Sequence, residues 1–487
     1  MDEWNNFLDE YKTINSLNYA QRLINFDFET YMPEMGNKWR AEASSIFNVV
    51  EKSEFMKLYK KYYNLLERTS DNDFKEGILR LLRREYHYYS SINDNLLLKI
   101  SKKRIEATQS WVKAKKENRF EYFSDHLNEI IILEKEIADR LGWKNNRYNA
   151  LLDIYEEGLN VEKADYIFEY VLKNTKIILD KIFSEGLFTE NSRLEKIKYN
   201  IENMKKLNIE ILKIFSIPLE RFGIFVSEHP FTTAISYNDV RITTRYYGIN
   251  FKSSLFSTIH EMGHAIYELQ KDKFLEFTPV QGSPSLGIHE SQSRFFENII
   301  GKSKYFIENT RNLMERYLKF LRNYNNEEIY YYFNNVKRSL IRVDADEVTY
   351  NIHIAIRYFI EKDLMEDKIN PKDIPDIWND MMEKYLGIRP EKHSDGALQD
   401  IHWAHGSFGY FPTYTLGNIL SSMIYEKGIL IKENLKSWNL NALKDYLHFS
   451  VHRYGSVYSP ERLLKISFGE YYNPEYLIKY IEEKYLK

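Results

Sequence analysis

Long stretches of this sequence lack the residues that interrupt helices. Proline accounts for 11 of the 487 residues and glycine for 19, which favours long helices over frequent turns. Apolar residues recur at three- and four-residue spacing in several stretches, and we predict amphipathic helices at residues 105–141, 163–183, 194–215 and 473–487. The expected fold is mainly α-helical, with the charged residues on the solvated faces of a large bundle.

One stretch differs from the segments that we expect to be helical. Residues 225–247 are rich in threonine, valine and isoleucine, and Asn238-Asp239 has the composition of a turn. This pattern predicts a small antiparallel hairpin or meander. No linker, low-complexity tract or repeat of 20–50 residues divides the chain, so we expect residues 1–487 to form a single unit with two helical lobes around a shared cleft.

Composition excludes several classes of protein. The formal net charge is -3, so no overall basic field indicates a nucleic-acid partner. There are no cysteines, which excludes disulfides, thiolate metal sites and a cysteine nucleophile. The sequence contains no run of about 18 apolar residues, so we expect no membrane span. The acidic start of the chain does not have the composition of a secretory signal, and we expect a cytoplasmic protein.

The segment FKSSLFSTIHEMGHAIYELQ contains the pattern H-E-x-x-H on an expected helix with a cap at Ser253 or Ser254. His260 and His264 are four residues apart, so their imidazoles lie on one face about one turn apart and can occupy two positions around a zinc ion. Glu261 projects beside them, where it can reach a metal-bound water. The pattern alone leaves open a chance grouping of three polar residues.

Gly263 strengthens the metal interpretation. Glycine inside a helix costs about 1 kcal/mol relative to alanine, and this chain contains little of it. A glycine between the two histidines therefore indicates a close neighbour at that point of the helix.

A catalytic zinc ion usually has three protein ligands. The segment SPSLGIHESQSRFFENIIG offers Glu290 near the start of a second helix, and His289 is the competing candidate. We favour Glu290 because it follows His264 by 26 residues, enough for one loop and a returning helix. Surface glutamates are common, so this assignment needs support from elsewhere in the chain.

Five motifs together resemble the carboxypeptidase Taq family of zinc metallocarboxypeptidases. In chain order they are HPF at 229–231, D-x-R-x-T at 239–243, H-E-x-x-H at 260–264, H-E-S-Q at 289–292 and G-x-x-Q-D-x-H-W at 396–403. Further segments near residues 26, 148 and 344 also resemble the family and extend the resemblance over nearly the whole chain. One difference is Phe26, where the family pattern has tryptophan.

The resemblance implies properties that composition does not show. It implies a helical fold with a long groove between two lobes and a small sheet beside the zinc helix. The implied activity is release of single residues from peptides with a free carboxyl terminus, with broad preference and poor release of proline. It also implies a homodimer and one metal ion per chain, held by His260, His264 and Glu290; zinc is expected, and cobalt fits the same ligands.

The chemistry then suggests roles for further residues. Glu261 would act as the general base. The oxyanion needs a non-metal donor, for which His402, Tyr410 and Tyr414 are candidates, with ordinary packing as the alternative. Arg241 or Arg342 would bind the substrate carboxylate, unless each is tied in a structural ion pair, for example with Asp239 or Asp346.

Other candidates are less specific. His229 and Gln399 belong to the family motifs and are expected on the substrate-binding side. Asp346, Glu347 and Asp400 could accept hydrogen bonds from the ligand imidazoles. The sequence leaves two other functions open: an oligoendopeptidase or dipeptidyl carboxypeptidase with a similar groove, and a non-catalytic peptide-binding protein, against which the intact Glu261 argues.

Overall fold

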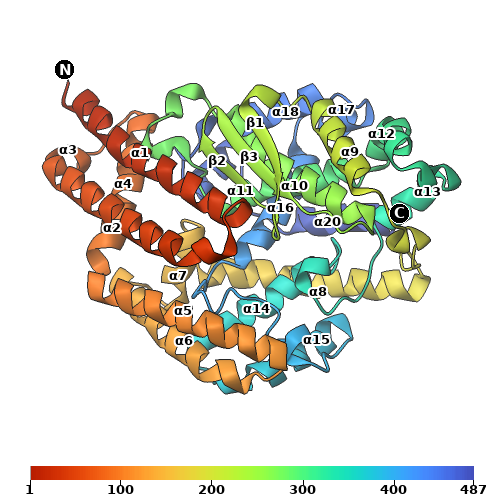
Figure 1. Cartoon of the computed structure of the whole chain (residues 1–487), viewed down its shortest axis with the longest axis horizontal. Helices are drawn as coiled ribbons and strands as arrows, with labels where there is room; N and C mark the ends of the chain where they lie inside the picture. Colours follow the sequence, from red (N-terminus) through yellow and green to blue (C-terminus); the bar gives the residue numbers. More distant parts are fainter. Residues whose placement is uncertain (1) are drawn as a thin grey trace.

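The computed structural model describes residues 2–487 and is built mainly of helices (Figure 1). In the first half of the chain the α-helices are Glu3–Thr30 (α1), Asn37–Lys61 (α2), Tyr63–Leu66 (α3), Asp73–Ser91 (α4), Asp94–Glu117 (α5), Glu121–Leu141 (α6), Tyr148–Tyr155 (α7), Val161–Glu185 (α8) and Ile201–Ile214 (α9). From the metal-motif helix onward they are Phe251–Gln270 (α10), Leu286–Arg294 (α11), Lys304–Tyr317 (α12), Asn326–Phe333 (α13), Tyr350–Met365 (α14), Ile374–Leu386 (α15), Pro412–Lys427 (α16), Ile431–Lys436 (α17), Leu440–Ser450 (α18), Pro460–Phe468 (α19) and Glu475–Tyr485 (α20).

The small sheet contains three strands: Phe222–Val226 (β1), Thr232–Ser236 (β2) and Asp239–Thr244 (β3). The predicted hairpin is present as β2 and β3, which are antiparallel and joined at Tyr237-Asn238. The prediction of a wholly antiparallel sheet was wrong in one pair, since β1 runs parallel to β3. In the order β1-β3-β2, β3 lies between the two earlier strands. The chain reverses direction between β1 and β2 and again between β2 and β3, so β3 runs in the same direction as β1.

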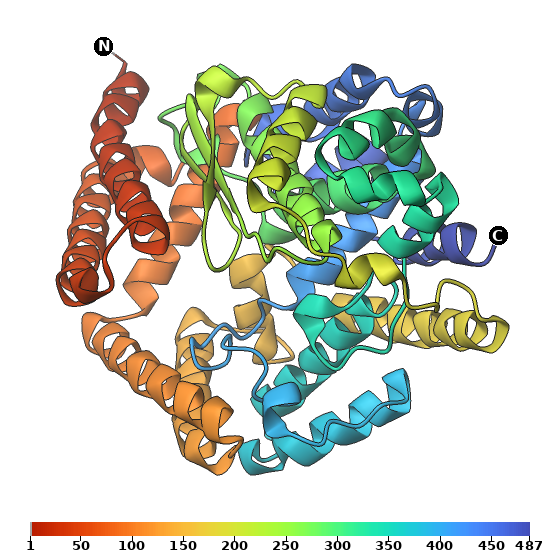
Figure 2. The same cartoon turned by 45° about the vertical axis from the view of Figure 1, so that its right-hand side comes forward.

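The sheet lies against the metal-motif helix α10 (Figure 2). Val240 and Ile242 of β3 are fully buried, whereas Arg241 between them is partly exposed. Side chains alternate between the two faces of a strand, so Arg241 lies on the face opposite Val240 and Ile242. On that face its guanidinium contacts the ring of Phe26 from α1.

Two of the four predicted helices are confirmed, as α8 and α20. The other two are interrupted. Residues 105–141 form α5 and α6, separated at Asn118, which adopts a left-handed conformation with φ of 55°. Asparagine tolerates this conformation better than most residues. Residues 194–215 break before α9, where the side chain of Asn200 caps the new helix. The cap predicted for α10 was also wrong, because the helix begins at Phe251 after Asn250.

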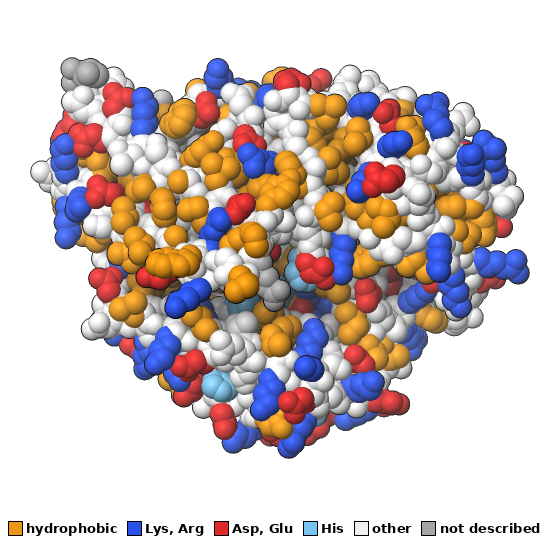
Figure 3. Space-filling model, viewed as in Figure 1, with side chains coloured by type: hydrophobic (Ala, Val, Ile, Leu, Met, Phe, Trp, Pro, Cys, Tyr) orange, Lys and Arg blue, Asp and Glu red, His pale blue; other side chains and the backbone are white. Residues whose placement is uncertain are grey.

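The buried apolar side chains of residues 2–487, as far as the structure describes them, form two clusters. The large one extends from α5 to α20, and the small one joins α1, α2 and α4 to Leu275, Val280 and Val457. Figure 3 shows a hollow near the middle of one face, with a histidine side chain at its edge. None of the helices described has the length and apolar character needed to cross a lipid bilayer. The division into two lobes of one catalytic unit stays a prediction.

Candidate metal centre

His260 and His264 both project from α10 toward α11. Their ring centroids are 5.1 Å apart, as expected for one turn of helix. The opposite side of α10 is anchored in the core by apolar residues that are almost fully enclosed: Leu255, Ile259, Met262 and Ile266. The helix is therefore fixed in rotation about its axis, and the direction of the two imidazoles is fixed with it.

Glu290 enters the same space from α11. Its Oε2 lies 3.5 Å from Nε2 of His260 and 3.3 Å from Nε2 of His264. One donor atom from each of the three residues lies within 4.8 Å of the others. The structure thus brings together the three metal ligands expected from the sequence.

Two glycines allow the helices to approach closely enough for this arrangement. A Cβ on Gly263 would lie 2.6 Å from Cα of Ser293, in α11. A Cβ on Gly417 of α16 would lie 2.5 Å from Cγ of Glu290. The close neighbour predicted beside Gly263 is therefore the backbone of α11, and α16 presses on the other side of Glu290.

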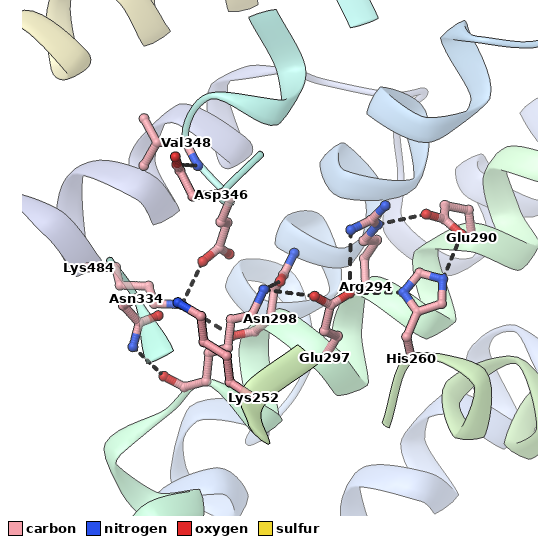
Figure 4. Close-up of polar contacts among 12 residues, drawn as sticks. Lys252, His260, Glu290, Arg294, Glu297, Asn298, Asn334, Asp346, Val348 and Lys484 are labelled. Atoms are coloured by element: carbon pink, nitrogen blue, oxygen red, sulfur yellow. Dashed lines mark hydrogen bonds and ion pairs between the residues drawn. The ribbon is translucent and has the colours of Figure 1, made fainter. Parts of the chain in front are cut away.

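A second layer of side chains orients these three. Nδ1 of His260 is hydrogen-bonded to Oε2 of Glu297 at 2.9 Å, which leaves Nε2 directed toward Glu290. Nε of Arg294 donates to Oε1 of Glu290 at 2.6 Å, and Ser293 Oγ donates to Oε2. Figure 4 shows His260 between the two carboxylates, with Arg294 beside them. Such partners fix the orientation of a ligand and tune its basicity.

The electrostatics of the cluster favour a bound cation. Burial disfavours a charged imidazole, but Glu290 and Glu297 outweigh it and raise the pKa of His260 to about 10. Burial would raise the pKa of Glu290, but Arg294 and His260 hold it well below its ordinary range. The carboxylates that attract a proton to this position also attract a metal ion, and two imidazoles with one carboxylate suit zinc. The residues present therefore fit a divalent metal.

A second acidic cluster, Glu106, His126 and Glu129, lies between α5 and α6. The ammonium of Lys103 is 2.9 Å from Glu106 and 2.8 Å from Glu129. That cation already neutralises the two carboxylates, so the cluster is an ion-pair group.

Glu261 is buried beside the cluster and turns toward the edge strand β2. Thr232 Oγ1 donates to Oε2 of Glu261 at 2.6 Å and also reaches the backbone carbonyl of Glu261. This contact holds the carboxylate in one orientation next to the two histidines. Thr232 follows the HPF motif directly, so the sheet positions the expected base.

His289, the competing ligand, lies outside the group of three. Its ring stacks on His264 with centroids 4.4 Å apart, and Nε2 is 3.1 Å from Oε1 of Glu268. It also borders a pocket of about 240 Å³ between β2 and the end of α10. The structure therefore favours Glu290 over His289 as the third ligand.

The three candidate oxyanion donors lie close to one another. The ring of Tyr410 is 5.4 Å from that of His402 and 5.4 Å from that of Tyr414. Burial lowers the pKa of His402 to about 4, so the imidazole is neutral at pH 7. Burial raises the pKa of both tyrosines, which stay protonated and able to donate. The structure brings this trio together but does not choose among its members.

Arg342 and Arg241 have different surroundings. Nε and Nη2 of Arg342 contact Oδ1 of Asp400, and Nη1 donates to Tyr350 at 3.1 Å. Tyr350 in turn lies under the guanidinium of Arg294, 4.6 Å away, so Arg342 is linked to the metal cluster. Arg241 is held by both carboxylate oxygens of Asp239 at 2.7 Å.

Asp400 and Gln399 organise a pair of arginines. Arg357 is fully buried and contacts Oδ2 of Asp400, opposite Arg342. Gln399 Oε1 accepts from the backbone N–H of Arg342 and from Arg357, both at 2.8 Å. Two guanidinium groups on one carboxylate leave a net positive charge. His229 is exposed in the loop after β1 and does not join this group.

The sequence reasoning missed Glu297, Arg294 and Thr232. Arg294 follows Glu290 by four residues on the same helix, and this spacing could have found it. Glu297 lies in the π-helical segment Phe295–Gly301, which the α-helical spacing does not reveal. The acidic residues considered instead have other partners: Asp346 caps its own turn, Glu347 pairs with Lys484, and Asp400 holds the arginines.

Comparison with known proteins identifies the family. The family model described as carboxypeptidase Taq (M32) metallopeptidase matches residues 6–485. The chain belongs to the carboxypeptidase Taq family. It is thus a peptide-bond hydrolase of a metal-dependent family.

Individual relatives of this carboxypeptidase Taq family member align with it over nearly their whole lengths. Thermostable carboxypeptidase 1 of Pyrococcus furiosus is 43% identical, with 98% of this chain and 97% of that protein aligned. A solved Pyrococcus furiosus carboxypeptidase superposes with a TM-score of 0.96 at 42% identity, covering 100% of this chain and 99% of the other. Metallocarboxypeptidase 1 of Trypanosoma cruzi gives a TM-score of 0.91 at 28% identity, covering 99% of both chains.

Proposed function

We propose that the chain is a zinc-dependent metallocarboxypeptidase that releases single residues from the carboxyl terminus of peptides. The observation that carries the proposal is the convergence of His260, His264 and Glu290 beside Glu261. Arg294 and Tyr350 connect Glu290 to the buried arginine pair. Broad preference with poor release of proline, and a cytoplasmic location, stay predictions.

His260, His264 and Glu290 would hold one metal ion per chain, zinc or cobalt. When bound, the ion would lower the pKa of a coordinated water and polarise the scissile carbonyl. Arg294 and Ser293 keep the carboxylate of Glu290 turned so that Oε2 faces both imidazoles. Glu297 keeps the Nε2 of His260 available as a ligand.

Glu261 acts as general base and then as general acid. Thr232 holds its carboxylate beside the ligands, where it accepts a proton from the attacking water and passes that proton to the leaving amine. A protonated tyrosine or the neutral His402 donates a hydrogen bond to the developing oxyanion.

Arg342 is the better candidate for the terminal carboxylate. It belongs to a group with a surplus of positive charge, whereas Asp239 neutralises Arg241 through two hydrogen bonds. Arg342 also contacts Tyr350, which lies against the second layer of the metal cluster. Gln399 fixes the backbone from which Arg342 projects, so it acts by positioning.

The test compares one peptide with a free carboxyl terminus and the same peptide amidated. Amidation removes the charge and paired acceptors that Arg342 binds; a charged hydrogen bond contributes about 1.5–3 kcal/mol, so kcat/KM should fall by one to two orders of magnitude. Acetylation of the amino terminus is the matched control and should have no such effect.

Mass spectrometry of the products distinguishes the alternatives. A ladder that loses one residue at a time, and stalls where proline must leave, supports the proposal. Internal fragments or loss of dipeptides would instead support an oligoendopeptidase or a dipeptidyl carboxypeptidase. Binding without cleavage in the presence of zinc would indicate a non-catalytic protein.

A further inference from the structure

A buried carboxylate on α14 contacts the segment that carries two of the three candidate oxyanion donors. We call residues 402–410, which begin with His402 and end with Tyr410, the donor loop. The carboxylate belongs to Glu361, which is fully buried. The helices α14 and α7, which both contribute to its surroundings, lie in the half of the molecule below the metal-motif helix in Figure 1. Neither the family motifs nor the metal site accounts for this group.

Three donors converge on Glu361. The indole Nε1 of Trp403 donates to Oε1 at 2.8 Å, and the backbone N–H of Gly409 donates to Oε2 at 2.8 Å. The hydroxyl of Tyr148, in α7, donates to Oε2 at 2.5 Å. Trp403 directly follows His402 and Gly409 directly precedes Tyr410 in the sequence. One carboxylate therefore holds the donor loop at both ends, one residue away from each candidate donor, and ties it to α7.

The backbone of the donor loop is seated closely against α7. Gly409 has a φ of 90°, a left-handed conformation that glycine adopts readily and other residues do not. A Cβ on Gly409 would lie 2.7 Å from the backbone oxygen of Leu151, in α7. The position therefore requires glycine both for its conformation and for the close approach. This packing directs the N–H of Gly409 toward Glu361.

The three groups that donate to Glu361 are all neutral. Burial raises the pKa of Glu361 to about 7, although the three hydrogen bonds act in the opposite direction. A carboxylate buried among neutral partners costs free energy, so packing alone does not explain its presence in this part of the core. What a carboxylate provides here is two oxygens that accept from both ends of the loop at once. Hydrogen bonds to a charged acceptor are also stronger than those between neutral groups.

We propose that Glu361 is a positioning residue for catalysis, which holds the donor loop so that His402 or Tyr410 meets the developing oxyanion. This role rests on the proposed peptidase function. Burial and the nearby charge of Glu290 raise the pKa of Tyr410, which is consistent with a hydroxyl close to the metal ligands. Tyr414, the third candidate donor, projects from α16 and is oriented by that helix instead. The proposal therefore assigns the oxyanion donor to the loop and not to α16.

The variant that tests this role is Glu361→Gln. Glutamine has nearly the same shape, but one of its two terminal atoms is an NH₂ donor. Whichever way the amide turns, that NH₂ faces the N–H of Trp403 or that of Gly409, so one end of the loop is released. A misplacement of about 1 Å can cost as much as 100-fold in rate, so kcat should fall by about 10- to 100-fold.

Steady-state kinetics on a short peptide with a free carboxyl terminus separates this role from a general structural one. The KM should change little, because Asp400 and Gln399 hold Arg342 independently of Glu361. An equal fall in kcat and kcat/KM indicates an interaction made only in the transition state. Metal content should match the wild type. Asp363→Asn is the matched control, since it removes a partly exposed carboxylate two residues further along α14 and should leave kcat unchanged.

Trp403→Phe provides a second variant, which removes one hydrogen bond to Glu361 and keeps an aromatic ring in place. It should lower kcat in the same way but by a smaller factor, and it decides the question if Glu361→Gln does not fold. A kcat within about twofold of wild type at full metal content, or an effect on KM alone, would overturn the proposal. Failure of the proposed function is a different result, because the wild type itself would then give no ladder of single-residue losses.

Discussion

The junction of α10, α11 and α16 and the distal half of the α1–α2 hairpin are both helical, but they are built in opposite ways. At the junction, Gly263 and Gly417 bring backbones so close that a single added carbon would clash. In the distal hairpin nearly every described side chain between residues 16 and 54 reaches solvent. Helix formation alone therefore does not determine where the candidate metal ligands converge. Close packing of helix backbones does.

The difference predicts opposite responses to mutation. Side chains at the junction have several partners each, so a small change there should alter metal binding or catalysis. Exposed side chains on α2, such as Trp39, Ile46 and Val49, have mainly solvent as their neighbour, so changes there should leave the site intact. The following predictions test this contrast in order of expected effect.

Glu261→Gln should have the largest effect. Glutamine keeps the size of the side chain and can still accept the hydrogen bond from Thr232, but it cannot take up the water proton. Loss of a general base typically costs about 10²–10⁴ in rate. Metal content, measured by elemental analysis, should match the wild type. A variant with more than about a tenth of wild-type kcat would contradict the role of Glu261 as general base.

Glu297→Gln should weaken metal binding by about 10- to 100-fold, the usual cost of losing the hydrogen-bond partner of a ligand histidine. The carboxylate holds Nδ1 of His260, and the amide cannot supply the same charge. Competition with a coloured chelator measures the affinity directly. Asp272→Asn, at an acidic residue just after α10, serves as the control. Equal metal affinities in the two variants would contradict the role of Glu297 in orienting His260.

Gly263→Ala should destabilise the junction by about 1–3 kcal/mol, the typical cost of overpacking a filled interior. The added Cβ would force α11 away from α10 and move Glu290 with it. Gly282→Ala is the matched control, since no atom of the described residues lies within 4 Å of its added carbon and its φ is compatible with alanine. The midpoint temperature of thermal unfolding and the metal affinity should both be lower in Gly263→Ala and unchanged in Gly282→Ala.

Ile46→Arg should have the smallest effect on the site. Surface substitutions usually change stability by no more than about 0.5 kcal/mol, so metal affinity and the kcat for a short peptide should stay close to wild type. Titration with chelator and a peptide assay on the purified variant measure both quantities. A loss as large as that of Gly263→Ala would show that the hairpin and the metal centre are not separate.

The metal helix was predictable because its signal is local. H-E-x-x-H places two histidines on one face of a helix by their spacing. Gly263 indicated a close neighbour, and in the structure that neighbour is the backbone of α11. The parallel pairing of β1 with β3 was not predictable, because it depends on a contact between two separate segments of the chain. The break at Asn118 has a local cause, a left-handed conformation that asparagine tolerates, and the apolar spacing on either side does not reveal it. The role of Glu297 depends on the helical path continuing past Arg294 as a π-helical segment, Phe295–Gly301, which the periodicity of the sequence does not reveal.

The most direct test of the metal centre is the metal content of three variants purified side by side without chelator: His264→Ala, Glu290→Ala and His289→Ala. The wild type should carry one divalent ion per chain. His264→Ala and Glu290→Ala should lose it, whereas His289→Ala should keep it, because His289 is engaged by Glu268 outside the group of three ligands. Retention of the ion by Glu290→Ala, together with its loss from His289→Ala, would contradict the proposed site and make His289 the third ligand.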